Sequence, residues 1–125
     1  MTVGGHLDTL RASLPGCTLV AYGDVSAQLV LRTSTDSAWP QEKLDDLCKS
    51  GARQFGLVDA MSPFRQSANP TREAIVTTRR DVRVYVGAPG AAGDVLCCVC
   101  RSGIDTDHVI HEARAALSNL LDRDQ

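Results

Sequence analysis

Three cysteines and two histidines are the residues whose types and spacing could do chemistry in this chain. Cys97, Cys98 and Cys100 lie in one apolar run, and His108 and His111 follow it, three residues apart. In a strand, Cys98 and Cys100 face one side and Cys97 the other, while an i, i+3 spacing can place both histidines on one face of a helix. Two thiolates and two imidazoles would complete a tetrahedral zinc site if that helix packed over that strand.

The same residues have a plainer explanation. Their spacing matches no familiar zinc pattern, and the histidines fall beside the positions of their helix that should pack, on its solvated side. Cysteines in an apolar strand commonly serve as small core residues. The residues therefore favour buried structural thiols and predict no metal site. A sensor that holds a metal or responds to oxidation through these five residues stays open as an alternative function.

No motif of a nucleotide-binding or nucleophilic enzyme occurs in the sequence. Gly87, Gly90 and Gly93 lie between two expected strands rather than between a strand and a helix, so they are turn residues and not a phosphate-binding loop. The three histidines all stand at expected helix starts, without the Gly-x-Ser-x-Gly turn that presents a catalytic serine. We therefore expect neither enzymatic activity nor a cofactor.

Composition restricts the class of protein further. The chain has 125 residues, which predicts a single domain over 1–125. Its 13 basic and 15 acidic residues argue against nucleic-acid binding, which needs an excess of positive charge. The longest apolar run is far too short to span a membrane, and the N-terminus does not resemble a signal peptide. Five cysteines are an odd number, so we expect reduced thiols and a soluble, cytoplasmic protein.

Hydrophobic periodicity indicates the elements that must position these residues. From Val82 to Val86, valines alternate with an arginine and a tyrosine, the period of a strand with one buried face and one partly solvated face. The run from Val95 to Cys100 is apolar throughout, which predicts a central strand covered on both faces. The other expected elements are helices over 3–14 and 40–61, a closing helix from Asp105, and strands over 18–22, 27–33 and 74–78. The predicted order is α-β-β-α-β-β-β-α, with an irregular connection over 57–72.

The second expected helix has an apolar stripe with a glycine in its middle. The stripe consists of Leu44, Leu47, Cys48, Gly51 and Phe55. A glycine inside a helix costs about 1 kcal/mol relative to alanine, so a close approach by a neighbouring element would explain its presence. Two neighbours are possible at this point: the sheet of the same chain, or the same helix of a second copy.

Arginines gather in the 22 residues from Ser62 to Arg83, where Glu73 and Asp81 are the acids. The cluster consists of Arg65, Arg72, Arg79, Arg80 and Arg83. Four of them, Arg72, Arg79, Arg80 and Arg83, are candidates for contact with an acidic patch on a partner or with a phosphate. A solvated sheet edge, protected by charge from unwanted strand pairing, explains the cluster equally well.

Taken together, these patterns resemble the Roadblock/LC7 superfamily, the small domains of dynein light chains and of bacterial partners of Ras-like GTPases. The residues that carry the resemblance are Leu14-Pro15-Gly16 before the strand over 18–22, the helix from Pro40, the hairpin strands over 75–78 and 82–86, and the apolar strand over 95–100 followed by Asp105 and the closing helix. The resemblance covers nearly the whole chain and rests on element order, because the family has no invariant catalytic motif.

The resemblance implies an α+β fold with a five-stranded antiparallel sheet, the second helix on one face and the first and last helices on the other. It also implies a non-enzymatic homodimer that binds or regulates a small Ras-like GTPase. The implied dimer interface joins the strand residues Ile75, Val76 and Thr77 and the helix residues Leu44, Leu47, Cys48, Gly51 and Phe55. A further alternative is a small-molecule-binding domain of the broader profilin-like architecture, with a pocket under the connection over 57–72.

Overall fold

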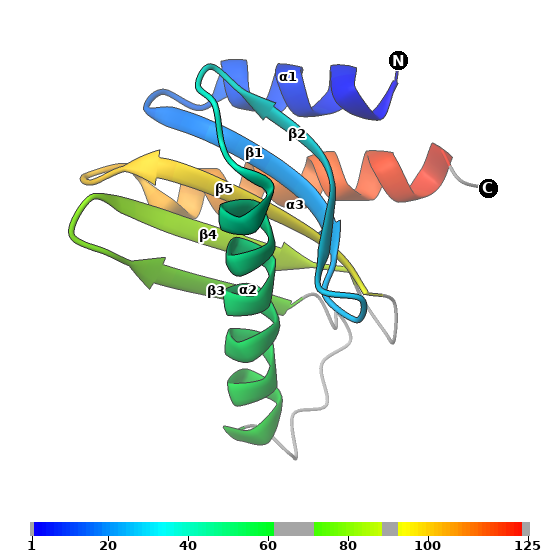
Figure 1. Ribbon diagram of the computed structural model, residues 1–125. Coiled ribbons are helices and arrows are strands. Elements are labelled where there is room, and N and C mark those ends of the chain that lie inside the picture. The colour runs from blue at the N-terminus through cyan, green and yellow to red at the C-terminus, as the bar shows by residue number, and fades with distance from the viewer. Residues whose placement is uncertain (1, 62–71, 89–92, 124–125) are drawn as a thin grey trace.

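The computed structural model describes residues 2–61, 72–88 and 93–123, and it confirms the predicted order of elements (Figure 1). The helices are α1 (Val3–Ser13), α2 (Gln41–Met61) and α3 (Thr106–Arg123), and the strands are β1 (Cys17–Asp24), β2 (Leu29–Thr35), β3 (Arg72–Thr77), β4 (Asp81–Gly87) and β5 (Asp94–Arg101). The irregular connection was predicted over 57–72, of which 57–61 belong to α2, Arg72 begins β3, and 62–71 lie outside the described part. Side chains of residues 58–61 and 122–123 also lie outside it.

The five strands form one antiparallel sheet in the order β2-β1-β5-β4-β3. The last strand in sequence is therefore the middle strand in space, as its uninterrupted apolar run predicted. From Val95 to Cys100, every side chain of β5 is buried. A central strand has neighbours on both edges and covers on both faces, so it has no position for a polar side chain.

Helices cover both faces of the sheet, in the arrangement that the resemblance implied (Figure 1). On one face, α1 and α3 lie side by side over a core that includes Leu7, Val20, Cys98 and Leu117. On the other face, α2 crosses the strands over a separate core of residues such as Leu19 and Leu47. The sheet therefore separates two hydrophobic cores, and alternate residues of β1, β4 and β5 contribute to each.

The strand β4 differs in one respect from its prediction. Its second face was expected to be partly solvated, but Tyr85 on that face is only 1% exposed. The phenol group of Tyr85 donates a hydrogen bond of 2.9 Å to the carbonyl oxygen of Leu47 in α2. Burial of this ring under the helix raises the pKa of Tyr85 well above its usual range, so the hydroxyl stays protonated and keeps its role as donor.

Gly51 occurs where α2 passes directly over Tyr85. A β-carbon at Gly51 would lie 2.6 Å from Cδ1 of the Tyr85 ring, well inside van der Waals contact. Next to it, the ring of Phe55 meets Tyr85 edge to face, with centroids 6.5 Å apart and an interplanar angle of 79°. Of the two explanations for this glycine, the structure supports close packing on the sheet of the same chain.

The first hairpin begins its return strand later than predicted. The strand expected over 27–33 spans Leu29–Thr35, and Gln28 before it adopts a left-handed conformation with φ of 57°. The Asp24 carboxylate accepts hydrogen bonds from the backbone N–H groups of Ser26 and Ala27, so the turn extends beyond Ser26. Side-chain hydrogen bonds of this kind compete with strand pairing, which is why the boundary moves.

Two glycines of α2 provide a matched test of this packing. Gly51→Ala should lower the free energy of unfolding by about 1–3 kcal/mol, because the new methyl group forces the helix away from Tyr85. Gly56→Ala should raise it by about 0.5–1 kcal/mol, because no atom lies within 4 Å of a β-carbon there and alanine favours the helix. Chemical denaturation at equal chain concentration measures both. A similar shift in the same direction for the two variants would contradict the assigned packing.

Candidate interaction site

Four arginines gather at the end of the sheet where β3 turns into β4 and β5 ends. Arg79 and Arg80 form the β3–β4 turn, and Arg83 follows two residues into β4. Arg101, at the end of β5, is paired in register with Asp81 of β4. We call the four arginines Arg79, Arg80, Arg83 and Arg101 the basic end of the sheet. Residues 78–83 and Arg101 together contain these four arginines and a single acid, Asp81.

Thr78 organises the backbone of this turn through its hydroxyl group. Its Oγ1 accepts hydrogen bonds from the backbone N–H groups of Arg80 and Asp81, both at 3.1 Å. The same hydroxyl donates to Oδ1 of Asp81 at 2.7 Å, and the backbone N–H of Thr78 donates to the Asp81 carbonyl at 2.9 Å. These contacts fix the course of the chain from which both turn arginines project.

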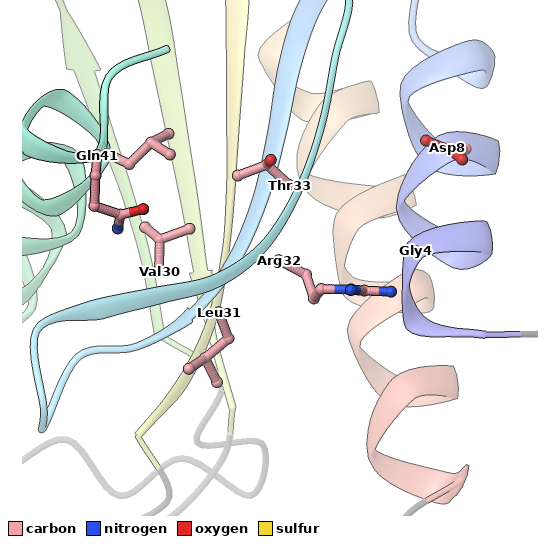
Figure 2. A pocket seen from close by; sticks show the side chains of 8 residues that line it. Gly4, Asp8, Val30, Leu31, Arg32, Thr33 and Gln41 are labelled. Atoms are coloured by element: carbon pink, nitrogen blue, oxygen red, sulfur yellow. The ribbon is translucent and has the colours of Figure 1, made fainter. Parts of the chain in front are cut away.

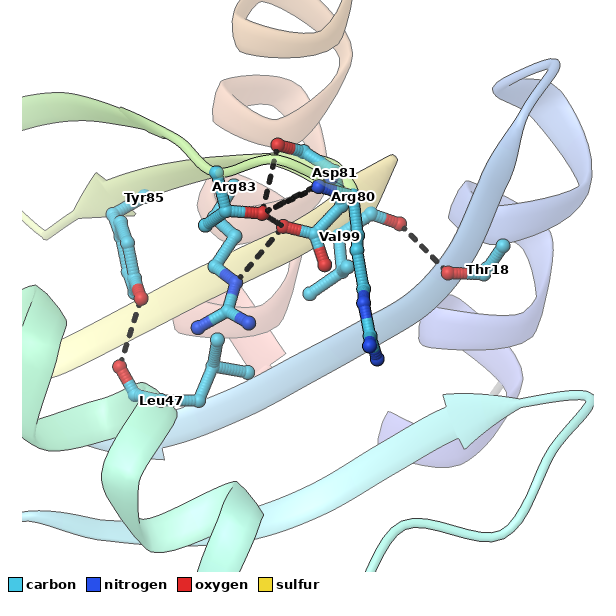
Figure 3. A network of polar contacts seen from close by, with 8 residues as sticks. Thr18, Leu47, Arg80, Asp81, Arg83, Tyr85 and Val99 are labelled. Carbon is cyan, nitrogen blue, oxygen red and sulfur yellow. Dashed lines mark hydrogen bonds and ion pairs between the residues drawn. The ribbon is translucent and has the colours of Figure 1, made fainter. Parts of the chain in front are cut away.

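The arginine side chains have different surroundings. Nε of Arg83 lies 3.2 Å from Oδ1 of Asp81, and the two side chains are 28% and 18% exposed. Figure 3 shows Arg80 and Arg83 projecting from the same face of the sheet as Tyr85, the face that α2 covers further along. Arg79, Arg80 and Arg101 are exposed. With one carboxylate against four guanidinium groups, this end of the sheet presents net positive charge that an acidic surface can meet.

Sequence reasoning placed Arg72 in this cluster, but the structure separates it from Arg79, Arg80 and Arg83. Arg65, which was predicted for the same cluster, lies outside the described residues. Arg72 begins β3 and pairs in register with Gly87, at the end of the hairpin opposite the turn. Its guanidinium carbon lies 5.1 Å from the centroid of the Phe55 ring, a cation–π contact with α2. Sequence reasoning missed Arg101 in turn, because its position beside Asp81 depends on the register of the β4–β5 hairpin.

Solved structures similar to this chain share its whole architecture. The Roadblock/LC7 domain from Streptomyces avermitilis has a TM-score of 0.77 and 12% sequence identity, over 96% of this chain and 95% of that one. The gliding protein MglB from Thermus thermophilus has a TM-score of 0.70 and 17% identity, over 91% and 82%. A structure described as MglB with a tetrameric arrangement has a TM-score of 0.71 and 17% identity, over 91% and 81%.

The chain has the Roadblock/LC7 fold. The resemblance inferred from the sequence is thereby confirmed at the level of the fold. No protein-family model matches the sequence, and no curated protein matches it. The resemblance to Roadblock/LC7 domains could therefore be inferred from the order of the elements, while sequence identity to these structures is only 12–17%. Within the described ranges, no helix of this Roadblock/LC7 fold is long and apolar enough to cross a membrane.

In this Roadblock/LC7 fold, β3 is an edge strand, and it carries the strand part of the predicted dimer interface. Ile75 is 46% exposed, Thr77 is exposed, and Val76 packs partly against the core under α2. The pairing of β3 with β4 runs from Arg72 to Thr77 without a bulge. A regular edge strand with an exposed β-branched residue is a template for pairing with another strand.

The helix residues of the predicted interface do not face solvent in the structure. Leu44, Leu47, Cys48, Gly51 and Phe55 are all buried against the sheet of the same chain. Among the residues of α2 with described side chains, the apolar surface that faces solvent includes Leu57, which is 53% exposed and follows the exposed Gly56. The stripe therefore positions α2 on the sheet of its own chain.

The opposite edge of the sheet, β2, is less suited to strand pairing. Its register with β1 shifts between Tyr22 and Gly23, which leaves Leu31 without a partner in the ladder. Such a bulge twists an edge away from pairing. An open polar hollow of about 300 Å³ borders this edge, between β2 and the first turns of α1 and α2. Figure 2 shows Arg32 extending toward α1 in this hollow.

The alternative pocket for a small molecule was predicted under the connection over 57–72, most of which lies outside the described residues. Beneath α2, in the described part, a void lined by residues including Ala21, Tyr85 and Cys97 has a volume of about 10 Å³. A space of that size holds at most one water molecule.

The cysteines of β5 and the histidines of α3 face the sides that the sequence predicted. Cys98 and Cys100 belong to the core beneath α1 and α3, and Cys97 belongs to the core beneath α2. His108 and His111 are exposed on α3. In the described ranges, no group of three or more histidine, cysteine or acidic side chains has the geometry to hold a metal ion. Burial raises the pKa of the Cys97 thiol, as expected for a structural core residue.

Two substitutions at Thr78 test how the basic end is held. Thr78→Val removes the hydroxyl group, so it should lower the free energy of unfolding by about 1–2 kcal/mol and speed amide hydrogen exchange at Arg80 and Asp81. Thr78→Ser keeps the hydroxyl and should stay near wild type in both respects. Denaturation and exchange monitored by NMR measure these effects. Unchanged exchange in the valine variant would show that the turn does not depend on this side chain.

Proposed function

We propose that this chain is a homodimeric interaction module, without catalysis of its own, that binds or regulates a small Ras-like GTPase. The Roadblock/LC7 fold and the resemblance on which it was recognised support the kind of function. The observation that carries the proposal is the contrast between the two sheet edges: β3 is regular and exposes Ile75, whereas β2 carries a bulge.

In the proposed dimer, the free edges of β3 from two copies pair antiparallel, so that one sheet continues across the interface. A C₂ axis makes such contacts self-complementary, and pairing satisfies backbone groups that an edge strand leaves open. Figure 1 shows α2 continuing past the β3 edge, which would bring the two copies of this helix together there. Leu57 would lie in the helix contact, and the buried stripe that includes Gly51 would set its position. The tetrameric arrangement of MglB supports self-association as a property of this fold.

The basic end is the proposed surface for the partner protein. A Ras-like GTPase would be held by contacts between its acidic groups and the arginines, and the dimer would position the partner's mobile switch segments without chemistry of its own. Arg80 and Arg83 project from one face of the sheet, so a single partner surface can contact both. Arg72 contacts α2 instead, and we assign it no contact with the partner.

Charge substitutions on the two sheet edges test the dimer. Wild type should have twice the 13.4 kDa mass of one chain by light scattering. Ile75→Lys should give a folded monomer, because it would bury a positive charge in the interface between the two β3 strands without an opposite charge to pair with it. Leu31→Lys, at a similarly exposed leucine of β2, should remain a dimer. A monomeric wild type would refute the interface, and a dimeric Ile75→Lys variant would place it elsewhere.

Charge reversal tests the partner surface. Candidate small Ras-like GTPases, loaded with GDP or a GTP analogue, would be titrated against the chain by calorimetry. Arg80→Glu combined with Arg83→Glu should raise the Kd by about tenfold or more, and higher salt should weaken wild-type binding.

Arg80→Glu alone should also raise the Kd, and Arg32→Glu is its matched control, because it makes the same charge change at an exposed arginine of the opposite edge. It should leave the Kd near the wild-type value. Equal losses in the two variants would show that net charge, and not the basic end, governs binding. Absence of binding to every GTPase tested by a dimeric wild type would refute the proposed partner class and leave the dimer standing.

A further inference from the structure

Three cysteines from two strands meet in the core beneath α1 and α3. Cys17 begins β1, while Cys98 and Cys100 lie near the end of β5, and all three belong to the same core. We call Cys17, Cys98 and Cys100 the thiol cluster. Cys17 is distant from the other two in sequence. The sheet order β2-β1-β5 brings it beside them.

Within the cluster, Cys17 and Cys100 have the geometry of a pair that a disulfide can join. They are direct partners in the register of β1 with β5, and a bulge follows in β1 between Cys17 and Leu19. The backbone N–H of Arg101 donates to the carbonyl oxygen of Gly16 at 2.9 Å, a bond between the residues that flank this pair. In a regular ladder, cross-strand partners flanked in this way do not hydrogen-bond to each other through their backbones, and their Cα atoms are about 4.5 Å apart. Disulfides bridge Cα separations of about 4.4–6.8 Å.

Cys98 is less well placed to pair with Cys17. Its direct partner across the strands is Val20, so its relation to Cys17 is diagonal. Diagonal neighbours on antiparallel strands are about 7–8 Å apart, beyond the usual span of a disulfide. The Cys98 thiol also reaches Cys17 as a hydrogen-bond partner, so the choice of Cys100 rests on its direct pairing with Cys17 in the register.

The surroundings of Cys17 differ from those of its neighbours. Cys17 is 9% exposed, while Cys98 and Cys100 are fully buried. An open hollow lies beside the pair, and its lining includes Gly16, which precedes Cys17, and Arg101, which follows Cys100.

The thiols also differ in how readily they ionise. Hydrogen bonds from Cys100 and Cys98 lower the pKa of Cys17, and the nearby Arg11 guanidinium acts in the same direction. The hydrogen bond to Cys17, followed by burial, raises the pKa of Cys100. Cys17 is thus the thiol of the cluster that ionises first and meets solvent first.

We propose that Cys17 and Cys100 are a peroxide-sensitive pair that forms a disulfide between β1 and β5. The Cys17 thiolate attacks one oxygen of hydrogen peroxide, the O–O bond breaks, and Cys17 becomes a sulfenic acid. The departing hydroxide takes up the proton that the Cys17 thiol had released and becomes water.

The second step closes the disulfide. The sulfur of Cys100 attacks the sulfenic sulfur, the S–S bond forms and the S–O bond breaks. The hydroxide that leaves takes the Cys100 thiol proton, giving a second water. Two thiols have then lost two electrons and two protons, and one peroxide has been reduced to two waters. The bridge ends one residue from Arg101, so it ties the start of β1 to the strand end that carries part of the basic end.

Thiol counting on the purified full chain tests the proposal. The reduced chain has five free cysteines, so iodoacetamide under denaturing conditions should add five labels before peroxide treatment and three afterwards. Intact mass without alkylation should fall by two hydrogen atoms, and dithiothreitol should restore five labels. Five labels after peroxide, or a gain of oxygen atoms at Cys17 without a disulfide, would overturn the proposal.

Peptide mapping identifies the partners in wild-type protein, independently of any variant. Trypsin releases Cys17 in a peptide over 12–32 and the three cysteines of β5 in one over 84–101, so the linked pair of peptides shows that Cys17 is joined to β5. Fragment ions must then place the bond on Cys100. A bond to Cys98 or Cys97 would refute the assignment.

Serine variants complete the test, with circular dichroism as a check of folding. Cys17→Ser and Cys100→Ser should each keep all four remaining thiols after peroxide. Cys98→Ser should still form the disulfide, and so should Cys48→Ser, whose cysteine lies beneath α2 on the other face of the sheet. Loss of the disulfide in the Cys48→Ser variant would point to exchange among several thiols and contradict the assigned pair.

Discussion

The packing of α2 over Tyr85 determines how the rest of the molecule is arranged. Gly51 lies on the ring, the phenol group donates to the Leu47 carbonyl, and Phe55 meets the ring edge. These contacts are directional, because the hydrogen bond to the backbone and the edge-to-face contact of the two rings each require a particular orientation. They set the line along which α2 crosses the strands, and hence the point at which it passes the β3 edge (Figure 1).

A second consequence is the separation of two cores with different contents. The core beneath α2 contains the aromatic contacts, and the core beneath α1 and α3 contains three of the five cysteines. A sheet sends alternate side chains to opposite faces, so a run such as Cys97 to Cys100 divides between the two. The packing that positions α2 and the proposed thiol chemistry therefore use different faces, and either can change while the other is kept.

Much of the fold was predictable because burial leaves periodic marks in the sequence. The unbroken apolar run of β5 indicated a central strand, and the sheet order agrees. The alternation of valines in β4 located that strand but did not predict the burial of Tyr85 on its second face. Helix boundaries followed from caps, as at Asp105, whose carboxylate accepts from the backbone N–H of His108. The late start of β2 was not predictable in the same way, because hydrogen bonds to the Asp24 side chain extended the turn.

The candidate site likewise contains features that the sequence predicted and features that it did not. The sequence by itself determined which residue types were present: arginines near the β3–β4 turn, a glycine in α2 and cysteines in β5. Tertiary structure alone decided that Arg72 contacts Phe55, that Arg101 joins the basic end, and that Cys17 faces Cys100. Local patterns depend on neighbours three or four positions away along the chain. The neighbours that make a site come from distant segments, and strand order and register bring them together.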